Sequence, residues 1–330
     1  MKKNYAVMDG NTAAAYVAYA FTEVAAIYPI TPSSPMAEKV DEWSAKGKKN
    51  LFGSTVDVIQ MQSEAGAAGT CHGSLQAGAL TTTFTSSQGL MLMIPAMYAM
   101  GGQFLPNVMH VASRVVTSNH HSIFGDHTDF MTCRTTGYAM LMSSSPQEAM
   151  DLGAVAHLSA ISARYAFMHC FDGFRTSHEM QRIETLDYED LRSFIDYDAF
   201  KEFRRQSLNP EHPTSRGNNV NPDIYFQCKE GANVKSAVVP DTVQHYICLL
   251  YTSAKHPVPG QTVATPQNQA PAFRFSPWET LPFFELYSLY DMRVLLCKGN
   301  KTLVSRETWN RPYSHTAIKK RLLFCAHPLV

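Results

Sequence analysis

The feature that most restricts the fold of this chain is an alternation of short apolar runs with longer amphipathic or small-residue runs. The apolar runs have the length of strands, and the runs between them have the length of helices. This alternation predicts a doubly wound α/β fold, in which helices cover both faces of a mostly parallel sheet. The predicted strands are residues 4–8, 24–28, 56–61, 80–84, 108–112 and 165–170. The predicted helices are residues 12–21, 34–43, 90–100, 146–163 and one that opens at residue 64.

Two of these strands end beside residues that can carry chemistry. Thr31 lies on the turn after residues 24–28, and Ser34 followed by Pro35 is typical of an N-cap and a first helical position. Glu64 follows the next strand and opens a helix made almost entirely of Ala and Gly. Open α/β sheets bind ligands outside the carboxyl ends of their strands. We therefore expect Thr31 and Glu64 to lie at a ligand-binding edge.

Residue type alone leaves ordinary explanations open for each candidate. A Thr on a turn is common turn chemistry, and a Glu in the first turn of a helix favours the helix dipole. Arg114, which follows the strand at residues 108–112, could be a surface charge. Three loop histidines, His120, His121 and His127, match no known metal-ligand spacing, so we predict no metal site in this chain.

Three longer segments carry a family resemblance. They are MDGNTAAAYVAYAFTEVAAIYPITPSSPMAE (8–38), MQSEAGAAG (61–69) and SRVVTSNHHSIFGDHTDFM (113–131). In their order and spacing they closely resemble the N-terminal domain of pyruvate:ferredoxin (flavodoxin) oxidoreductase, from about residue 4 to about residue 247. The resemblance implies a pyrimidine-binding domain for thiamine diphosphate, residues 1–247, with the doubly wound fold predicted above.

The activity that the resemblance implies is oxidative decarboxylation of pyruvate to acetyl-CoA, a reaction of the 2-oxoacid:ferredoxin oxidoreductases. Its implied partners are pyruvate, coenzyme A, and ferredoxin or flavodoxin as electron acceptor, and the full enzyme is expected to be a homodimer. Magnesium and iron–sulfur clusters would belong to other domains. The pair Gly125-Asp126 is not the magnesium-diphosphate motif of thiamine enzymes, because a third Gly and a downstream Asn pair are missing.

The resemblance also implies roles for single residues. Glu64 matches the glutamate that hydrogen-bonds a ring nitrogen of the cofactor's aminopyrimidine, which requires a partly buried acid able to share a proton. Arg114 matches the residue that pairs with the substrate carboxylate, for which a guanidinium fork is well suited. Thr31 matches a residue beside the bound pyruvate, where its hydroxyl can donate a hydrogen bond. We expect these three residues to be the catalytic and binding residues of the chain.

Composition narrows the class of protein further. Lys and Arg balance Asp and Glu at 28 each, and no apolar run approaches the length of a membrane span, so we expect neither nucleic acid nor a membrane as partner. Seven cysteines include no C-x-x-C pair. This argues against a disulfide framework, structural zinc or an iron–sulfur cluster bound by this chain alone, and a reducing, cytoplasmic location fits best.

The pattern changes toward the C-terminus. Residues 188–205 predict a charged helix and residues 209–219 a loop on the same domain. From Cys248 onward the resemblance ends, and ten Lys and Arg face four Asp and Glu, against 18 and 24 before it. A run rich in Pro, Gln and Thr follows, and residues 281–296 are apolar enough for a helix. We interpret residues 248–330 as an artefactual or poorly ordered tail, such as a frameshift or chimeric junction; the alternative is a genuine divergent linker and small domain.

Two other functions stay open from the sequence. One is another 2-oxoacid:ferredoxin oxidoreductase, which would share the plan and differ in the acyl pocket. The other is a non-catalytic, truncated half-site. In either case we expect the chain as given to be inactive alone, because it lacks the magnesium loop and clustered cysteines that the reaction needs.

Overall fold

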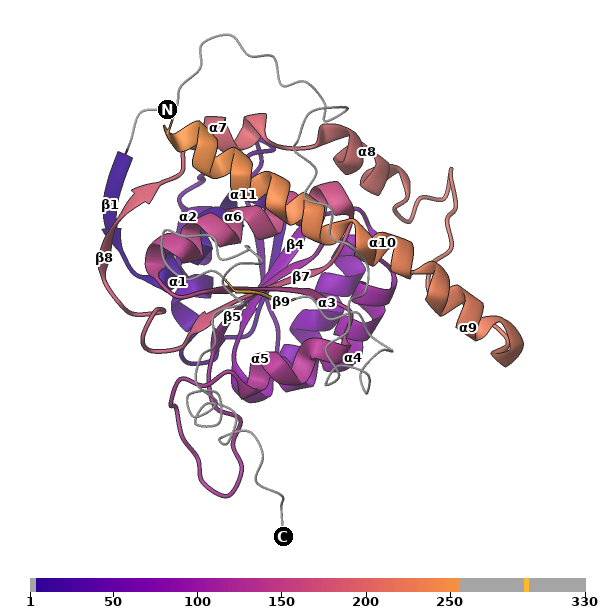
Figure 1. The fold of residues 1–330 in the computed structure, drawn as a ribbon, viewed down its shortest axis with the longest axis horizontal. Helices are drawn as coiled ribbons and strands as arrows, with labels where there is room; N and C mark the ends of the chain where they lie inside the picture. Colours follow the sequence, from indigo (N-terminus) through magenta and orange to yellow (C-terminus); the bar gives the residue numbers. More distant parts are fainter. Residues whose placement is uncertain (1–3, 256–293, 297–330) are drawn as a thin grey trace, which may run out of the picture. The chain divides into compact units, whose positions relative to one another are not determined.

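The computed structural model describes residues 4–255 and 294–296 (Figure 1). A parallel sheet with the strand order β3-β2-β4-β5-β7-β6 forms the centre of the protein. Its strands are β2 (Val24–Ile27), β3 (Asp57–Gln60), β4 (Thr81–Thr85), β5 (Val108–Ser113), β6 (Ala139–Ser143) and β7 (Phe167–Asp172). A short strand, β9 (Val294–Leu296), follows β6 in the strand order.

Helices cover both faces of the sheet, as the alternation predicts. On one face α1 (Gly10–Phe21) packs against α2 (Ser34–Ala45) and α6 (Pro146–Ala163), and α11 (Val239–Lys255) lies on α6 (Figure 1). On the other face α3 (Glu64–Gln76) packs against α4 (Ser87–Gly102), which also contacts α5 (Thr128–Thr132). The remaining helical segments are the 3-10 turn η1 (Cys133–Thr135), α7 (Tyr188–Ser193), α8 (Tyr197–Arg205), α9 (Pro222–Gly231) and α10 (Asn233–Ala237). The predicted doubly wound, mostly parallel fold is confirmed.

Three strands depart from the predicted arrangement. The first predicted strand, β1 (Asn4–Met8), does not join the parallel sheet; it pairs antiparallel with β8 (Gln181–Thr185), a strand that the sequence pattern did not predict. The physical reason is amphipathicity, because β1 keeps Val7 65% exposed and only one face of the ribbon is covered. Strand β6 was also missed, since its Met-rich sequence does not stand out as a strand.

Helix boundaries were predicted within a few residues, with three corrections. The predicted charged helix at residues 188–205 is two helices, because Asp196 caps α8 by accepting a hydrogen bond from the backbone N–H of Ala199 at 2.9 Å. The N-cap of α2 is Ser33 rather than Ser34, and its hydroxyl donates to the carbonyl of Ile30 at 2.7 Å. Residues 294–296, predicted as part of a helix, form β9.

The rest of that predicted helix, and of the tail beyond residue 255, lies outside the described residues. Helix α11 runs across the domain boundary expected after residue 247, and Leu250 is buried. That boundary stays a prediction.

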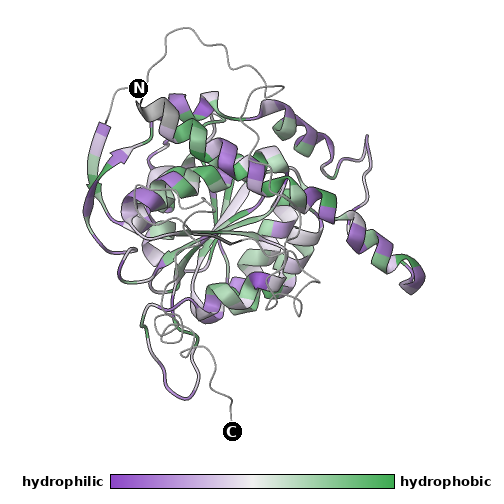
Figure 2. Ribbon diagram, viewed as in Figure 1, coloured by the Kyte–Doolittle hydropathy of each residue, from purple (hydrophilic) through white to green (hydrophobic). Residues whose placement is uncertain are grey.

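The core follows from the apolar strands and the small-residue helices. In Figure 2 the strands of the central sheet are mostly hydrophobic, whereas α9, which has no buried residue, projects from the body of the protein. Close helix packing depends on small side chains: a Cβ added to Gly153 of α6 would lie 2.8 Å from Val17 of α1. The described helices include none that is both long and apolar enough to cross a membrane.

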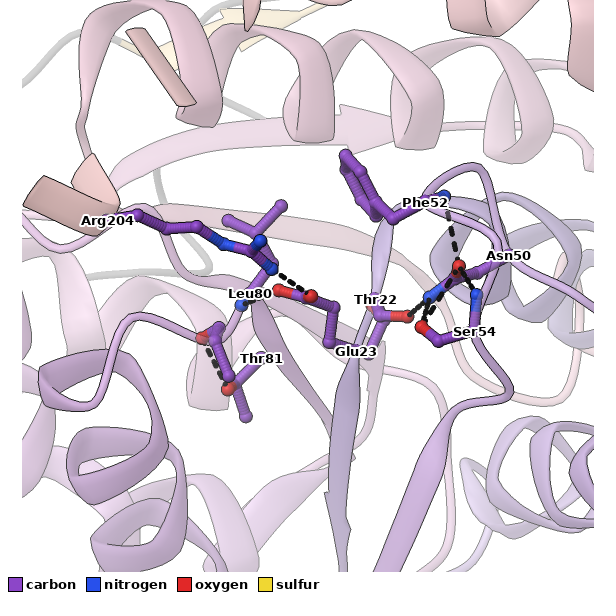
Figure 3. A network of polar contacts seen from close by, with 9 residues as sticks. Thr22, Glu23, Asn50, Phe52, Ser54, Leu80, Thr81 and Arg204 are labelled. Carbon is purple, nitrogen blue, oxygen red and sulfur yellow. Dashed lines mark hydrogen bonds and ion pairs between the residues drawn. The ribbon is translucent and has the colours of Figure 1, made fainter. Parts of the chain in front are cut away.

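Buried polar groups hold the strands in register at the amino edge of the sheet (Figure 3). The Asn50 side chain donates to the carbonyl of Thr22 at 2.8 Å, and its oxygen accepts from the backbone N–H groups of Phe52 and Ser54 at 3.0 Å. The carboxylate of Glu23 accepts from the backbone N–H of Leu80, just before β4, and forms an ion pair with Arg204 of α8. These contacts connect the start of β2 to neighbouring segments at the amino edge.

Candidate functional site

The carboxyl ends of β2, β3, β4 and β5 lie along one edge of the sheet, because these strands are parallel. Each predicted site residue follows one of them. Thr31 lies on the turn after β2, Glu64 opens α3 after β3, and Arg114 directly follows β5. The strand between them, β4, leads into the first turn of α4. All three residues therefore lie at the same carboxyl edge of the sheet, and its role in binding a ligand stays a prediction.

Glu64 is a buried acid without a hydrogen-bonding partner. Its residue is 6% exposed, and among the described residues no side chain or backbone group donates to its carboxylate. The local sequence explains its placement: Ser63 caps α3 by accepting from the N–H of Gly66 at 3.1 Å, which sets Glu64 at the first helical position. A ligand at this edge could therefore donate a hydrogen bond to the unpartnered carboxylate.

The carboxylate of Glu64 lies against α4 at a position where only glycine leaves room. A Cβ added to Gly89 would be 2.7 Å from Oε1 of Glu64 and 2.8 Å from Oγ1 of Thr85. The buried hydroxyls of Thr85 and Ser86 also have no hydrogen-bond partner within the described part of the chain. This corner of the site thus combines a close backbone approach with unsatisfied polar atoms.

Arg114 is held by contacts from two neighbouring strand ends. One of its terminal nitrogens donates to the carbonyl of Thr31 at 2.8 Å, and the other donates to the side-chain oxygen of Gln88 at 3.2 Å. The residue is 6% exposed, and its buried Nε has no partner among the described residues. Burial lowers the pKa of the guanidinium, while the nearby Asp129 charge opposes that shift. A partly buried cation with free N–H donors is suited to a carboxylate ligand.

The backbone carbonyl of Thr31 accepts the hydrogen bond from Arg114. The residue is exposed, and its peptide bond to Pro32 is cis. The side chain of Asn11, at the start of α1, donates to the carbonyl of Pro32 at 2.9 Å and supports the turn from below. The structure thus brings Thr31 and Arg114 into direct contact.

Sequence reasoning missed the element that links Glu64 to Arg114. The first turn of α4 places Gly89 against Glu64 and Gln88 against Arg114. Ser87, at φ 49°, donates from its hydroxyl to the carbonyl of Val115 at 2.6 Å. The available signal was positional, because the sequence Ser-Ser-Gln-Gly follows β4 just as the predicted site residues follow β2, β3 and β5.

A buried acid, Asp129, also escaped the sequence analysis. Its carboxylate accepts from the backbone N–H of Ser87 at 2.7 Å, of Arg114 at 3.1 Å and of Phe130 at 2.6 Å, and from the hydroxyl of Ser113. Burial raises its pKa, and these four donors oppose the rise. Asp129 therefore joins the end of β5 to the first turn of α4, and so fixes the backbone from which the Arg114 side chain extends.

The loop histidines do not form a metal centre in the described part of the chain. Residues 114–127 form a loop that projects from the body of the protein, and His120 and His121 are exposed on it (Figure 1). No group of three or more His, Cys, Asp or Glu among the described residues is arranged to hold a metal ion. Burial raises the pKa of Asp172, and nearby His127 opposes this rise without cancelling it.

The fold and this edge define the class of α/β cofactor-binding domains, in which ligands lie at the carboxyl ends of parallel strands. Within that class the chain belongs to the family described as pyruvate flavodoxin/ferredoxin oxidoreductase, thiamine diphosphate-binding, whose model matches residues 16–247. The prediction made from the sequence motifs is confirmed at the level of the family.

Individual relatives agree with this assignment. The chain is 61% identical over 236 residues to the pyruvate:ferredoxin oxidoreductase of Moorella thermoacetica, and 60% identical over 240 residues to the pyruvate-flavodoxin oxidoreductase of Klebsiella pneumoniae. These matches cover 72% and 73% of this chain but 20% of each relative, so the chain spans only a fifth of their length.

A solved structure has a similar fold. The 2-oxoglutarate:ferredoxin oxidoreductase of Magnetococcus marinus, with 2-oxoglutarate, coenzyme A and succinyl-CoA bound, superposes with a TM-score of 0.58 at 18% identity. The match covers 72% of this chain and 46% of that chain. At this identity the comparison supports the architecture.

The site residues fit the pyrimidine end of thiamine diphosphate. An aminopyrimidine offers ring nitrogens and an exocyclic amine, and Glu64 offers a buried carboxylate that lacks a donor. The unsatisfied hydroxyl of Thr85 lies beside this carboxylate, because both are within 2.8 Å of a Cβ placed on Gly89. The diphosphate and its metal find no equivalent group of acidic ligands among the described residues.

Proposed function

We propose that this chain supplies the pyrimidine half of a thiamine diphosphate site in a pyruvate:ferredoxin or pyruvate:flavodoxin oxidoreductase. The observation that carries the proposal is Glu64, a carboxylate at the edge of the sheet that is 6% exposed and has no hydrogen-bond donor among the described residues. The names of relatives at 60% and 61% identity support pyruvate as the substrate.

Glu64 would hold a proton at the cofactor's ring nitrogen. Its carboxyl group could share a proton with that weakly basic nitrogen through a hydrogen bond. The bound cofactor, in turn, supplies the carbanion chemistry that decarboxylation of a 2-oxoacid requires. The small residues of α3 and Gly89 of α4 would form a close wall beside the carboxylate.

Arg114 and Thr31 would bind and orient pyruvate. The contacts to the Thr31 carbonyl and to Gln88 occupy only part of the guanidinium, so the remaining N–H donors are available to the substrate carboxylate. The exposed hydroxyl of Thr31 can donate a further hydrogen bond to the same carboxylate or to the reacting oxygen. Gln88 keeps the guanidinium fork in one orientation.

The other parts of the reaction fall to domains outside the aligned segment. We propose that they hold magnesium with the diphosphate and the iron–sulfur clusters, bind coenzyme A and pass electrons to ferredoxin or flavodoxin. The complete enzyme would be a homodimer in the cytoplasm. The cysteines of the described residues are all free, and Cys71, Cys133 and Cys170 are buried, which fits a reducing compartment.

A chimeric enzyme tests the proposal. Residues 1–247 of this chain replace the matching segment of the pyruvate-flavodoxin oxidoreductase relative, and pyruvate-dependent reduction of flavodoxin is measured. We expect activity in the chimera and, in its Glu64→Gln variant, retained cofactor binding with exchange of the thiazolium C2 proton slowed about 100- to 10,000-fold. The exchange is followed by NMR after acid quench.

Glu189→Gln is the matched control, because Glu189 is a largely exposed acid of α7 whose contact is an ion pair with Arg192. It should leave both exchange and activity unchanged. Exchange at the parent rate in the Glu64→Gln chimera would show that this carboxylate is structural and would refute the assignment.

A further inference from the structure

A small cavity of about 110 Å³ lies between the ends of several helices, away from the site described above. Arg164 ends α6, and Gln103 and Phe104 follow α4. Because α4 leads into β5 and α6 leads into β7, these residues precede their strands. The cavity is therefore at the amino edge of the sheet, opposite to the edge that carries Glu64 and Arg114.

Positive charge in this cavity is not balanced by the residues around it. Arg164, Arg216 and Lys235 all line it. Within the described ranges, the ammonium of Lys235 has no hydrogen-bond partner and Arg216 has no ion pair. Arg164 pairs with Glu202 at 3.8 Å, but Glu202 lies closer to Arg205, at 2.6 Å. An anion in the cavity would compensate this excess charge.

The cationic groups are close enough to repel one another. Burial lowers the pKa of Arg216 and of Lys235, and the charge of Arg164 lowers both further. The guanidinium groups are nevertheless held in place by neutral partners. Arg164 donates to the side-chain oxygen of Gln206 at 3.1 Å, and Arg216 donates to the backbone carbonyl of Gln206 at 2.5 Å. Preorganised cations of which, in the described part of the chain, only Arg164 has an acidic partner, at 3.8 Å, are suited to an anion site.

Backbone strain occurs at the same place. Arg164 has φ 48° and Phe104 has φ 54°, and a non-glycine residue in this left-handed region costs free energy. Helix α6 ends in a left-handed residue, a position that glycine usually occupies, but here the residue is Arg164. Both strained residues instead place a side chain in the wall of the cavity. The strain is an observation independent of the charges, and it points to a use for these side chains.

Size restricts the ligand. Pockets that enclose whole drug-sized molecules measure about 300–1,000 Å³, so a cavity of about 110 Å³ is too small for a complete nucleotide. It can hold a small oxyanion, or the terminal group of a longer molecule. Three cations favour a divalent group over a monovalent carboxylate, and guanidinium forks match phosphate oxygens geometrically.

We propose that this cavity binds phosphate, either as the free ion or as the terminal group of a phosphate monoester. Arg164, Arg216 and Lys235 provide the charge, and Phe104 and Phe203 form its apolar walls. The site is separate from the proposed catalytic edge, and binding there does not require the thiamine diphosphate function.

Isothermal titration of the full chain with inorganic phosphate, at constant ionic strength set by chloride, tests this proposal. We expect saturable binding in the parent chain. The informative variant is Arg164→Gly, because glycine suits the left-handed backbone at this position and removes the guanidinium without straining the fold. Its affinity should fall at least about tenfold, the usual effect of losing one charge-assisted hydrogen bond. Lys235→Met should also weaken binding.

Lys201→Met is the control, because Lys201 is an exposed lysine of α8 that does not line the cavity. Its affinity should equal that of the parent. Titration with glycerol 3-phosphate separates the two sources: comparable affinity identifies a site for terminal phosphates, and binding of inorganic phosphate alone identifies a site for the free ion. Absence of saturable phosphate binding by the parent, or unchanged affinity in a folded Arg164→Gly variant, would overturn the proposal.

Discussion

Arg114 owes its orientation to residues that are distant in the sequence. The carbonyl of Thr31, the side chain of Gln88 and the carboxylate of Asp129 fix its two terminal nitrogens and its backbone. Thr31 follows β2, Gln88 follows β4 and Asp129 belongs to α5, so the position of the guanidinium depends on how the sheet and these segments pack. A residue held in this way can present a fork to a carboxylate at little additional entropic cost.

Arg114→Lys tests the role of the fork in the chimeric enzyme. Lysine keeps the positive charge but cannot form two parallel hydrogen bonds, so the transition state should lose about 1–3 kcal/mol of stabilisation. We expect kcat/KM for pyruvate to fall about 5- to 150-fold, mainly through KM. Steady-state kinetics with pyruvate as the varied substrate measures this change.

Arg134→Lys is a suitable control, because Arg134 is exposed and donates only to the carbonyl of Met131. An unchanged KM for pyruvate in the Arg114→Lys chimera would contradict the assignment of Arg114 to the substrate carboxylate.

At the scale of elements, a buried chain of histidines joins β5, β7 and α6. His110 and His169 contact through their Nδ1 atoms at 3.0 Å, and His110 and His157 contact through their Nε2 atoms at 3.0 Å. Ser143 donates to the carbonyl of Glu148, so it accepts from Nε2 of His169 at 2.7 Å. It follows that His110 donates to His169 and His157 donates to His110, with all three rings neutral.

This chain of neutral histidines makes stability depend on pH. Burial lowers the pKa of His157 and of His169 to about 3, and lowers that of His110 as well, whereas unfolded histidines titrate near about 6.5. The unfolded state therefore binds more protons below pH 6.5. The stabilisation is fully present above that pH and is lost as the pH falls toward 3, by up to about 1.4 kcal/mol per histidine per pH unit. Urea unfolding at pH 7.5, 6.5 and 5.5 measures it.

The comparison with His157→Gln isolates the histidine contribution. Buried Asp151, whose pKa burial raises to about 7, acts in the opposite direction but is present in both proteins. We expect the variant to lose about 1.4 kcal/mol less per pH unit than the parent. His120→Gln, at an exposed loop position, should leave the pH slope unchanged. A His157→Gln slope equal to that of the parent would show that this ring is charged in the folded state.

At the scale of the whole molecule, we propose that the chain contains one side of a site that needs two. It spans 20% of the length of its relatives from Moorella thermoacetica and Klebsiella pneumoniae. Glu64 would offer the cofactor one hydrogen bond. The described residues contain no cluster of three or more His, Cys, Asp or Glu side chains that could hold a metal ion for the diphosphate. The cofactor carries most of its charge on that diphosphate.

We therefore expect the isolated chain to bind thiamine diphosphate and magnesium without appreciable affinity, and to lack pyruvate-dependent activity. One charge-assisted hydrogen bond contributes about 1–3 kcal/mol, which cannot offset the roughly 4–15 kcal/mol lost when a ligand is immobilised. Isothermal titration of the isolated chain with thiamine diphosphate and magnesium tests this expectation. Saturable micromolar binding by the isolated chain would mean that residues 256–330 supply ligands that the sequence motifs do not reveal.

The sequence by itself determined the layers of the fold and the positions of the three candidate residues along it. Strand and helix periods are local properties, so they predicted β2 to β5, β7 and the helices α1 to α4 and α6, and placed Thr31, Glu64 and Arg114 after strand ends. The long helix α11 was not predicted. It also determined the family, because three dense motifs in a fixed order are specific. These inferences need no knowledge of which strand lies beside which.

Only the tertiary structure decided what surrounds those residues. That Gln88 and Gly89 lie between Arg114 and Glu64, and that Asp129 anchors the Arg114 backbone, depends on the strand order β2-β4-β5 rather than on any local pattern. The prediction that β1 joins the main sheet was wrong for the same reason. Strand β1 pairs with β8, and pairing between residues far apart in the chain is a property of the packed molecule. The cations that line the cavity, Arg164, Arg216 and Lys235, likewise come from segments far apart in the sequence and meet only in the folded molecule.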